Sequence, residues 1–362
     1  MKHFIIGRAE NGFYRYQGWP TVCIDENGVL YAVCSGNRLG HLCVYGKNYL
    51  YKSFDGGESW TPPMIINDTY LDDRDAGITY LGDGRMLMTY FCHPWQFYAN
   101  RREWVKGYTD AVSFPMASGL LDGYANLPEE LNKYGSFVRL SRDYGNTWEE
   151  AVKVPVTAPH GPIKLQNGKL FYLGKEFHSK DPELEEGAIY AFESDDDGAT
   201  WQKLCKIDFP EGLGKNNMHE PHALELPDGT IIGSIRAQGE GVPHRFSIYN
   251  CFSNDGGKSF SPPECLAVSG SPPHLLLHSS GAVILTYGRR EAPFGERVMI
   301  SRDGGKTWGE EHVISEARCN DLGYPATAEL PDGSLITVYY ERYKDDRFTS
   351  ILGVKWIIEE FE

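Results

Sequence analysis

The chain has 362 residues, of which 41% are hydrophobic, and its formal net charge at pH 7 is −15. That charge argues against nucleic acid or an anionic membrane as a partner, because both bind basic protein surfaces. No stretch is apolar and long enough to span a bilayer, and no linker of biased composition divides the chain. We therefore expect one domain over residues 1–362, in which positive charge gathered in a pocket would stand out.

The cysteines give no sign of a metal or redox site. There are eight, scattered along the chain without a C-x-x-C pair. The N-terminal residues contain no apolar segment of the length that a signal peptide needs. We expect a cytoplasmic protein with reduced thiols, without a metal or another cofactor.

A hairpin pattern recurs six times along the chain. Each copy is an apolar run, a turn that ends in glycine, and a second apolar run. Asp-Gly and Asn-Gly turns between apolar runs are the strongest short-range signal of a β-hairpin. The six turn glycines are Gly28, Gly84, Gly168, Gly229, Gly281 and Gly333.

An eight-residue phrase follows five of these hairpins. It has the form Ser-x-Asp-x-Gly-x-Ser/Thr-aromatic, and we interpret its aspartate as a structural, turn-forming residue. Each unit has four strands: two in the hairpin, one before the phrase and one after it. Six such units predict an all-β, six-bladed β-propeller. The five copies are SFDGGESW (53–60), SRDYGNTW (141–148), SDDDGATW (194–201), SNDGGKSF (253–260) and SRDGGKTW (301–308).

Two segments depart from the repeat. The sixth phrase is missing, so we expect KHFIIG (2–7) to pair as the outermost strand beside residues 348–358 and close the ring. Residues 93–135 lengthen the second unit and are rich in aromatic residues. This insertion could be a lid over a pocket, a contact in a homo-oligomer, or a loop packed on its own blade.

The topology predicts which residues share a face. Turns between strands 1 and 2 lie on the same face as the repeated phrase, so strand 1 begins and strand 2 ends on the opposite face. Ionisable and aromatic residues occupy those positions, which is the pattern expected of a binding or catalytic site. Each residue also has a structural alternative: a histidine satisfied within the fold, an ion pair between Arg236 and Glu341, or a turn capped by Asp75. The strand 1 positions are Trp19, Arg74, Asp75, His160, Glu220, His222, His274 and Tyr324, and the strand 2 positions include Arg38, Arg236, Arg289 and Glu341.

The repeated phrase is the Asp-box, and six blades bearing it resemble the sialidase superfamily over essentially the whole chain. EPHALELPDGTIIGSIR (220–236) is similar to the blade that carries the family's catalytic glutamate and one carboxylate-binding arginine. TYGRR (286–290) matches the region of another arginine of that triad, and residues 324–341 resemble the blade with the tyrosine nucleophile. The resemblance implies Tyr324 as nucleophile, Glu220 as its base, and Glu341 as the acid that orients an arginine.

That set of residues suits a sugar acid. Guanidinium groups bind a carboxylate in bidentate fashion, and we expect Arg236 and Arg289, with Arg74 or Arg38, to do so. A carboxylate nucleophile would be repelled by the substrate, which is why a tyrosine attacks in sialidases. The remaining expected substrate-binding residues are His160, His222, His274 and Trp19.

The first blade departs from the family. In QGWPT (17–21), Gly18 stands where the family has its first arginine, and GNRLGHLCVYGKNYLYKS (36–53) lacks the family's acid/base aspartate. The candidates in that stretch are Arg38 and His41, and Arg74 and Asp75 of the second blade are candidates to supply the missing charge and acid from a different blade. The substrate is therefore not expected to be an ordinary α-sialoside.

We expect an exo-acting glycoside hydrolase that cleaves a terminal, acidic sugar from a glycan, with Asp75 as general acid/base. Two alternatives stay open. One is hydrolysis or elimination on a uronic acid or another non-sialic sugar, and the other is a carbohydrate-binding propeller without catalysis.

Overall fold

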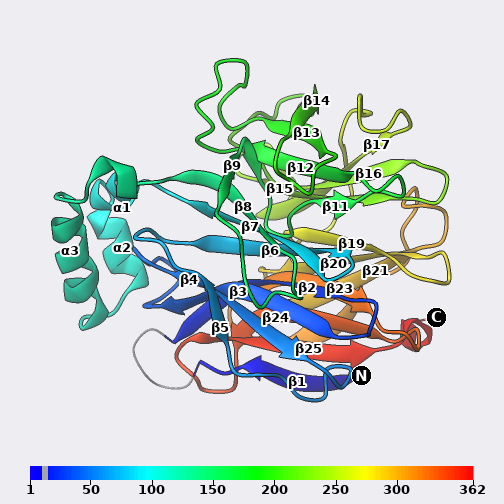
Figure 1. The fold of residues 1–362 in the computed structure, drawn as a ribbon. Coiled ribbons are helices and arrows are strands. Elements are labelled where there is room, and N and C mark those ends of the chain that lie inside the picture. The colour runs from blue at the N-terminus through cyan, green and yellow to red at the C-terminus, as the bar shows by residue number, and fades with distance from the viewer. Residues whose placement is uncertain (10–14, 362) are drawn as a thin grey trace.

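The computed structural model describes residues 1–9 and 15–361. The strands form six antiparallel sheets (Figure 1), and the predicted six-bladed β-propeller is confirmed. Contacts between neighbouring blades run around the whole ring. The first strand β2 (Tyr16–Ile24) contacts β6 (Arg74–Gly82) and β23 (Gly323–Glu329), and β19 (Pro273–Leu277) contacts β15 (Met218–Glu225) and β23. The third blade contacts β6 through β11 (Ile163–Lys164) and β15 through β12 (Leu170–Glu176). In the third blade two short strands, β10 and β11, share the innermost position and both pair with β12.

Strand order within a blade follows the chain. The innermost strands are β2 (Tyr16–Ile24), β6 (Arg74–Gly82), β10 (Val156–Thr157) with β11 (Ile163–Lys164), β15 (Met218–Glu225), β19 (Pro273–Leu277) and β23 (Gly323–Glu329). The second strands are β3 (Leu30–Arg38), β7 (Arg85–Cys92), β12 (Leu170–Glu176), β16 (Ile231–Gln238), β20 (Val283–Arg289) and β24 (Leu335–Arg342). The third strands are β4 (Lys47–Ser53), β8 (Gly135–Ser141), β13 (Ile189–Ser194), β17 (Phe246–Ser253), β21 (Gly295–Ser301) and β25 (Thr349–Trp356). The outermost strands are β5 (Met64–Asn67), β9 (Val152–Val154), β14 (Gln202–Lys206), β18 (Glu264–Cys265), β22 (His312–Glu316) and β1 (Lys2–Gly7).

The N-terminal strand completes the last blade, as predicted. β1 pairs antiparallel with β25, so that Lys2 lies opposite Lys355 and Ile5 opposite Leu352. Strand β25 already pairs with β24 on its other side. The N-terminal and C-terminal strands of the chain are thus joined in one sheet, which closes the ring.

The Asp-boxes form tight turns on one face of the propeller. In the last of them, Asp303 accepts a hydrogen bond from the backbone N–H of Thr307 at 2.8 Å, and Ser301 accepts one from Gly305 N–H at 2.8 Å. The same contacts recur in the other four. Tyr144 of the second Asp-box donates its N–H to the carbonyl of Gly84 at 2.9 Å, so the Asp-boxes and the hairpin turns share a face. The opposite face is left for the strand ends that carry the candidate site.

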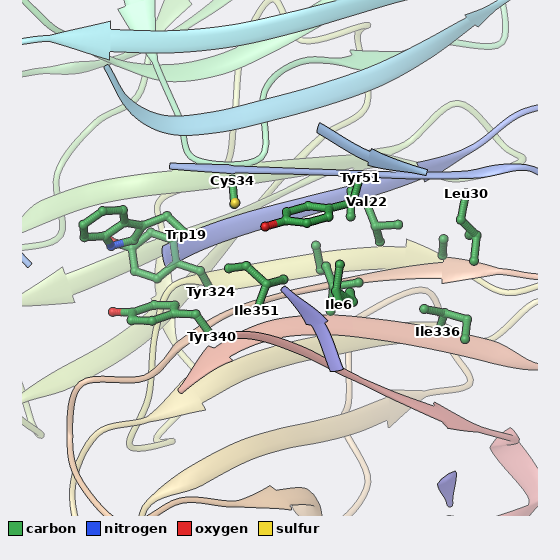
Figure 2. Packing of buried hydrophobic residues seen from close by; sticks show 14 of the residues in the cluster. Ile6, Trp19, Val22, Leu30, Cys34, Tyr51, Tyr324, Ile336, Tyr340 and Ile351 are labelled. Atoms are coloured by element: carbon green, nitrogen blue, oxygen red, sulfur yellow. The ribbon is translucent and has the colours of Figure 1, made fainter. Parts of the chain in front are cut away.

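The apolar core lies between neighbouring blades. Between the first and last blades, Ile6, Val22 and Ile336 pack together, and an aromatic group lies at one end of the same cluster (Figure 2). In that group Tyr340 lies 5.8 Å from Trp19 and 6.0 Å from Tyr324, between ring centroids. The core that joins the two ends of the ring therefore also supports the candidate site.

The expected insertion is helical and lies between β7 and β8. It contains α1 (Trp95–Ala99), α2 (Arg102–Tyr108), α3 (Ser113–Tyr124) and a 3-10 turn at Glu129–Leu131. In Figure 1 these helices project from one side of the propeller. Among the described residues, no helix is both long and apolar enough to cross a membrane. Since a connection between strands 2 and 3 leaves from the face opposite the Asp-boxes, the insertion stands beside the candidate site.

Candidate active site

Four blades present one residue each through the same backbone irregularity. The register of the innermost strand shifts in β2, β6, β15 and β23. A β-bulge of this kind re-aims a side chain, and a positive φ in a residue other than glycine is uncommon and concentrated at functional sites. The residues at these shifts have positive φ: Trp19 (56°), Asp75 (49°), Glu220 (42°) and Tyr324 (52°).

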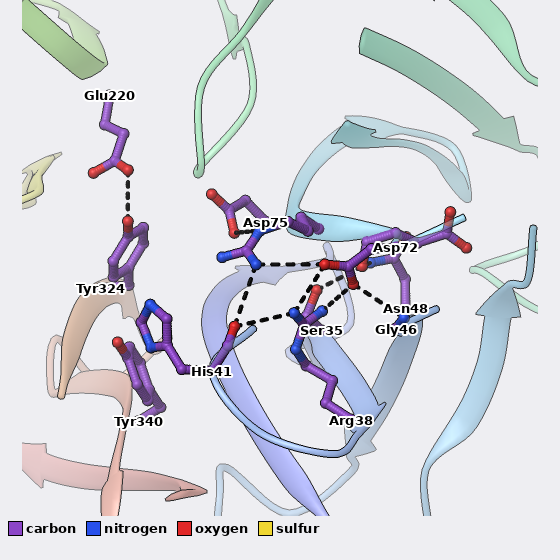
Figure 3. Close-up of polar contacts among 12 residues, drawn as sticks. Ser35, Arg38, His41, Gly46, Asn48, Asp72, Asp75, Glu220, Tyr324 and Tyr340 are labelled. Carbon is purple, nitrogen blue, oxygen red and sulfur yellow. Dashed lines mark hydrogen bonds and ion pairs between the residues drawn. The ribbon is translucent and has the colours of Figure 1, made fainter. Parts of the chain in front are cut away.

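Tyr324 and Glu220 form the centre of the site. The phenol of Tyr324 donates a hydrogen bond to Glu220 Oε1 at 2.6 Å (Figure 3). Burial raises the pKa of Tyr324 well above its usual value, and the charge of Glu220 adds to that. Burial would also raise the pKa of Glu220, but Arg236 and the hydrogen bond from Tyr324 lower it overall. The glutamate is therefore ionised and oriented to accept the phenol proton.

Two arginines flank the tyrosine. Arg236 Nη1 forms an ion pair with Glu220 Oε2 and a hydrogen bond of 3.2 Å with Tyr324 Oη. Arg290 lies with its guanidinium carbon 5.3 Å from the centre of the Tyr324 ring. Its Nη2 donates to Tyr340 Oη at 2.8 Å, and its Nε donates to the carbonyl of Leu322 at 2.9 Å.

The structure corrects the placement of Arg289. Its Nη1 contacts Glu311 Oε1 at 2.9 Å, away from Tyr324, while the next residue, Arg290, faces the site. Successive side chains of a strand point to opposite sides, so only one of two adjacent arginines can face the site. The sequence alone did not show which of the two adjacent arginines faces the site.

Glu341 shows the same one-residue error. It lies beside Ser315, whose hydroxyl donates to Glu341 Oε1 at 3.3 Å, in an outer cavity together with His3. Burial raises the pKa of Glu341 to about 7. The neighbouring Tyr340 faces the site instead, so Glu341 orients no arginine there, and Arg236 pairs with Glu220 rather than with Glu341.

Arg38 and Trp19 lie beneath the site, and their side chains are buried in the protein. Arg38 is fully buried, and its Nη2 donates to Asp72 Oδ2 at 3.0 Å. The guanidinium carbon of Arg38 lies 4.7 Å from the centre of the Trp19 ring, and that of Arg74 lies 4.2 Å from it. The substrate contact expected of Arg38 and Trp19 is therefore replaced by a supporting role. Asp72 was missed as a partner, although it belongs to the acidic run LDDRDAG.

Asp75 is a carboxyl group suited to proton transfer. Its Oδ1 is buried without a hydrogen-bond partner among the described residues, and Arg74 Nε lies 3.9 Å away. Burial raises the pKa of Asp75 to about 7, and the charge of Glu220 also raises it, while Arg74 lowers it. A carboxyl with such a pKa is an efficient proton donor near neutral pH.

The three channel histidines contact one another instead of lining the cavity. The ring centroids of His222 and His274 are 4.5 Å apart, and His160 lies 4.9 Å from His274. Burial lowers the pKa of each. His222 and His274 each accept a backbone N–H, from Leu275 at 3.0 Å and from Thr327 at 3.3 Å. The three histidines occupy equivalent positions in three blades, so their side chains all point to the propeller axis. They meet there as a cluster of uncharged rings.

A second polar network joins His41, which the sequence analysis named as a candidate, to Asp321 and Tyr16, which it missed. His41 Nδ1 lies 2.9 Å from Asp321 Oδ1, and Tyr16 Oη donates to the same oxygen at 3.0 Å. Burial lowers the pKa of His41, although Asp321 opposes that shift. Asp321 precedes β23 in a loop, and nothing in its sequence context signals a partner in the first blade.

An open cavity of about 640 Å³ leads to this site. His41, Arg236 and Arg290 stand at its inner end, and the last turn of α2 forms part of its wall. Its charged residues are mostly arginines, in a chain whose net charge is strongly negative. The arginines of the lining are Arg236, Arg245, Arg290, Arg342 and Arg347, and the carboxylates are Asp110 and Asp321.

A family model described as "BNR repeat-like domain" matches residues 123–337, which is more than half of the chain. The chain belongs to the BNR repeat-like domain family. The BNR repeat is the Asp-box, and together with the six-bladed propeller it places the chain in the sialidase/BNR propeller superfamily, as the sequence predicted. A search of curated proteins finds no match.

Solved structures share the fold of this BNR repeat protein at low sequence identity. A Dyadobacter fermentans protein of unknown function is 21% identical, with a TM-score of 0.76 over 98% of this chain and 97% of that one. A leech intramolecular trans-sialidase is 17% identical, with a TM-score of 0.69 over 99% and 70%. An α-L-arabinofuranosidase from Fusarium graminearum is 13% identical, with a TM-score of 0.63 over 99% and 98%. The fold is therefore one that glycoside hydrolases of different specificity use.

Proposed function

We propose that the protein is an exo-acting glycoside hydrolase that removes a terminal acidic sugar from a glycan. The observation that carries the proposal is the buried Tyr324–Glu220 pair at 2.6 Å with two arginines beside it. A phenol needs a base to become a nucleophile, and a structural tyrosine needs no ionised glutamate as its only acceptor. The arginines suit a substrate that carries a carboxylate next to the bond to be cleaved.

The reaction has two steps. In the first, Tyr324 Oη bonds to the anomeric carbon while its proton passes to Glu220; the glycosidic C–O bond breaks, and Asp75 protonates the departing oxygen. In the second, Asp75 takes a proton from water, whose oxygen attacks the anomeric carbon. The bond to Tyr324 breaks, and the phenol regains its proton from Glu220.

The second candidate is a non-sialic acidic sugar such as a uronic acid. Two observations favour it over an ordinary sialoside: Gly18 provides no guanidinium, and Arg74 is already engaged by Trp19 and Asp72. Among the described residues, Arg236 and Arg290 are the arginines that lie beside Tyr324, and we propose that they bind the carboxylate.

A panel of aryl glycosides, including α-sialosides and uronides, tests the proposal. We expect turnover of at least one acidic glycoside, and Glu220→Gln should lower kcat by about 10²–10⁴-fold because the general base is lost. Tyr324→Phe should abolish turnover, whereas Tyr70→Phe, at an exposed tyrosine outside the site, should leave it unchanged. Turnover that survives Tyr324→Phe would refute the nucleophile, and binding of glycans without turnover of any would favour a binding propeller.

A further inference from the structure

The outer half of the cavity has an aromatic wall that the proposed reaction does not use. Trp104 and Tyr108 lie one turn apart on α2, with ring centroids 5.9 Å apart, and both line the cavity. Their exposed fractions are 42% and 48%, although large aromatic side chains are usually covered. Tyr108 also lies 5.4 Å from His41, which connects this wall to the inner end of the cavity. Exposed aromatic rings on a cavity wall offer apolar faces on which a sugar ring can lie.

Basic residues form the other side of the outer cavity. Phe246 is contacted by the guanidinium groups of Arg236 at 4.6 Å, Arg245 at 5.4 Å and Arg290 at 5.6 Å from its ring centre. The Phe246 ring thus connects Arg245 to Arg236 and Arg290, the two arginines that flank Tyr324. The positive charge is continuous from the inner end of the cavity to its rim.

The outer arginines are not neutralised equally. Arg347 pairs with Asp110. Among the described residues, neither Arg245 nor Arg342 has a carboxylate partner, and Asp321, the other acid of the cavity, is held by His41 and Tyr16. Two unpaired guanidinium groups facing one cavity, in a protein with a net charge of −15, indicate a ligand with negative charge there.

We propose that the outer cavity binds a second acidic sugar, on the leaving-group side of the bond to be cleaved. The proposal rests on the proposed function and names its substrate class: a glycan whose last two units are both acidic. The terminal unit places its carboxylate near Arg236 and Arg290. The second unit lies against Trp104 and Tyr108, and its acidic group meets Arg245 and Arg342. The cavity volume of about 640 Å³ falls within the range of about 300–1,000 Å³ that is usual for small-molecule sites.

Binding to the Tyr324→Phe variant tests this separately from catalysis. The probes are α2,8-disialic acid and digalacturonic acid, each compared by calorimetry with the methyl glycoside of its single acidic sugar. We expect at least one diacid to bind more tightly than its single-sugar counterpart. Arg245→Gln with Arg342→Gln should weaken binding of that diacid by about 10–100-fold, the range for one or two charge-assisted hydrogen bonds. The same double change should weaken binding of the single sugar less than about 3-fold.

The matched control removes two arginines from the opposite face. Arg142 and Arg302 belong to Asp-boxes, so Arg142→Gln with Arg302→Gln changes the net charge equally and should leave both affinities unchanged. Trp104→Ala should weaken diacid binding specifically. Equal losses for both kinds of probe, an equal effect of the control, or no preference for either diacid would overturn the second-sugar site. A preserved diacid preference in a protein that hydrolyses no glycoside would instead refute the proposed function and leave this site standing.

Discussion

At the scale of single residues, the site depends on which carboxyl groups hold a proton. Glu220 and Asp75 both face Tyr324, and their pKa values are driven apart: Arg236 lowers that of Glu220, while burial raises that of Asp75 to about 7. Two carboxyl groups with opposite shifts are the usual arrangement for a base and an acid in one site. The pair therefore gives the reaction one acceptor and one donor at the same pH.

The raised pKa of Asp75 predicts the alkaline limb of the pH profile. Asp75 is protonated, and able to donate, below its pKa of about 7, so kcat/KM should fall as the pH rises through that value. Asp75→Asn should lower kcat/KM by about 10²–10⁴-fold on substrates with poor leaving groups and remove this limb. Measuring kcat/KM from about pH 5 to about pH 9, a range that spans this titration, checks the prediction. An unchanged alkaline limb in the Asp75→Asn variant would assign that limb to another group.

Gly18 is the second residue whose effect can be predicted. A Cβ at this position would lie 3.3 Å from the Tyr16 ring and 3.5 Å from the Tyr340 ring, both of which border the site. Gly18→Arg should therefore destabilise the protein by about 1–3 kcal/mol, as overpacking does, without creating sialidase activity. Urea unfolding and an aryl α-sialoside assay check this, with Gly18→Ala as the control for the Cβ alone. Efficient sialoside turnover by Gly18→Arg would show that the missing arginine was the only barrier.

At the scale of elements, the repeats predicted the strands well because each hairpin and each Asp-box is a local signal. The ring closure by residues 2–7 also followed, since the last blade was one strand short. The sequence did not predict which side chains at the strand ends face the site. Arg289 and Glu341 were each one residue away from the side chain that faces the site, because adjacent side chains of a strand point to opposite sides and the sequence does not show which side faces the site. The bulges with positive φ, which aim Glu220 and Tyr324, have no residue signature that sequence reasoning could use.

The Asp-box turns predict how stability depends on pH. Hydrogen bonds from the Thr307 hydroxyl and backbone lower the pKa of Asp303 to about 2. A carboxylate with a lowered pKa stabilises the fold above its unfolded value of about 4, and this contribution disappears as the pH falls through about 2. Asp303→Asn should therefore lower the melting temperature by about 1–3 °C at neutral pH and have a smaller effect near pH 2. Melting curves of both proteins across that range check the prediction, and a difference independent of pH would contradict it.

At the scale of the whole molecule, the propeller is a closed ring whose stability depends on the pairing of β1 with β25. Ile6 of β1 is 7% exposed and packs between the first and last blades, whereas its neighbour Ile5 is 38% exposed. The same blade carries Tyr324 on β23. Loosening of the outer strand therefore affects the blade that holds the proposed nucleophile.

A pair of neighbouring substitutions tests this join. Ile6→Ala should lower the free energy of unfolding by about 2–5 kcal/mol, because it removes buried methyl groups and leaves a cavity. Ile5→Ala provides the matched control and should cost less than about 1 kcal/mol, since its side chain is largely in water. Urea unfolding of the two variants gives both values. Similar losses for the two would show that β1 contributes through its backbone pairing alone.

The pairing of β1 with β25 also determines when the protein can fold during its synthesis. The ribosome releases Gly7 long before Thr349. At about 5–20 residues per second, the residues between them take about 20–70 s to translate. Throughout that interval β1 lacks the strand with which it pairs in the folded protein. A chain stalled before Thr349 already contains Tyr324 and Glu220 but lacks β25, so the blade that holds the tyrosine is still incomplete.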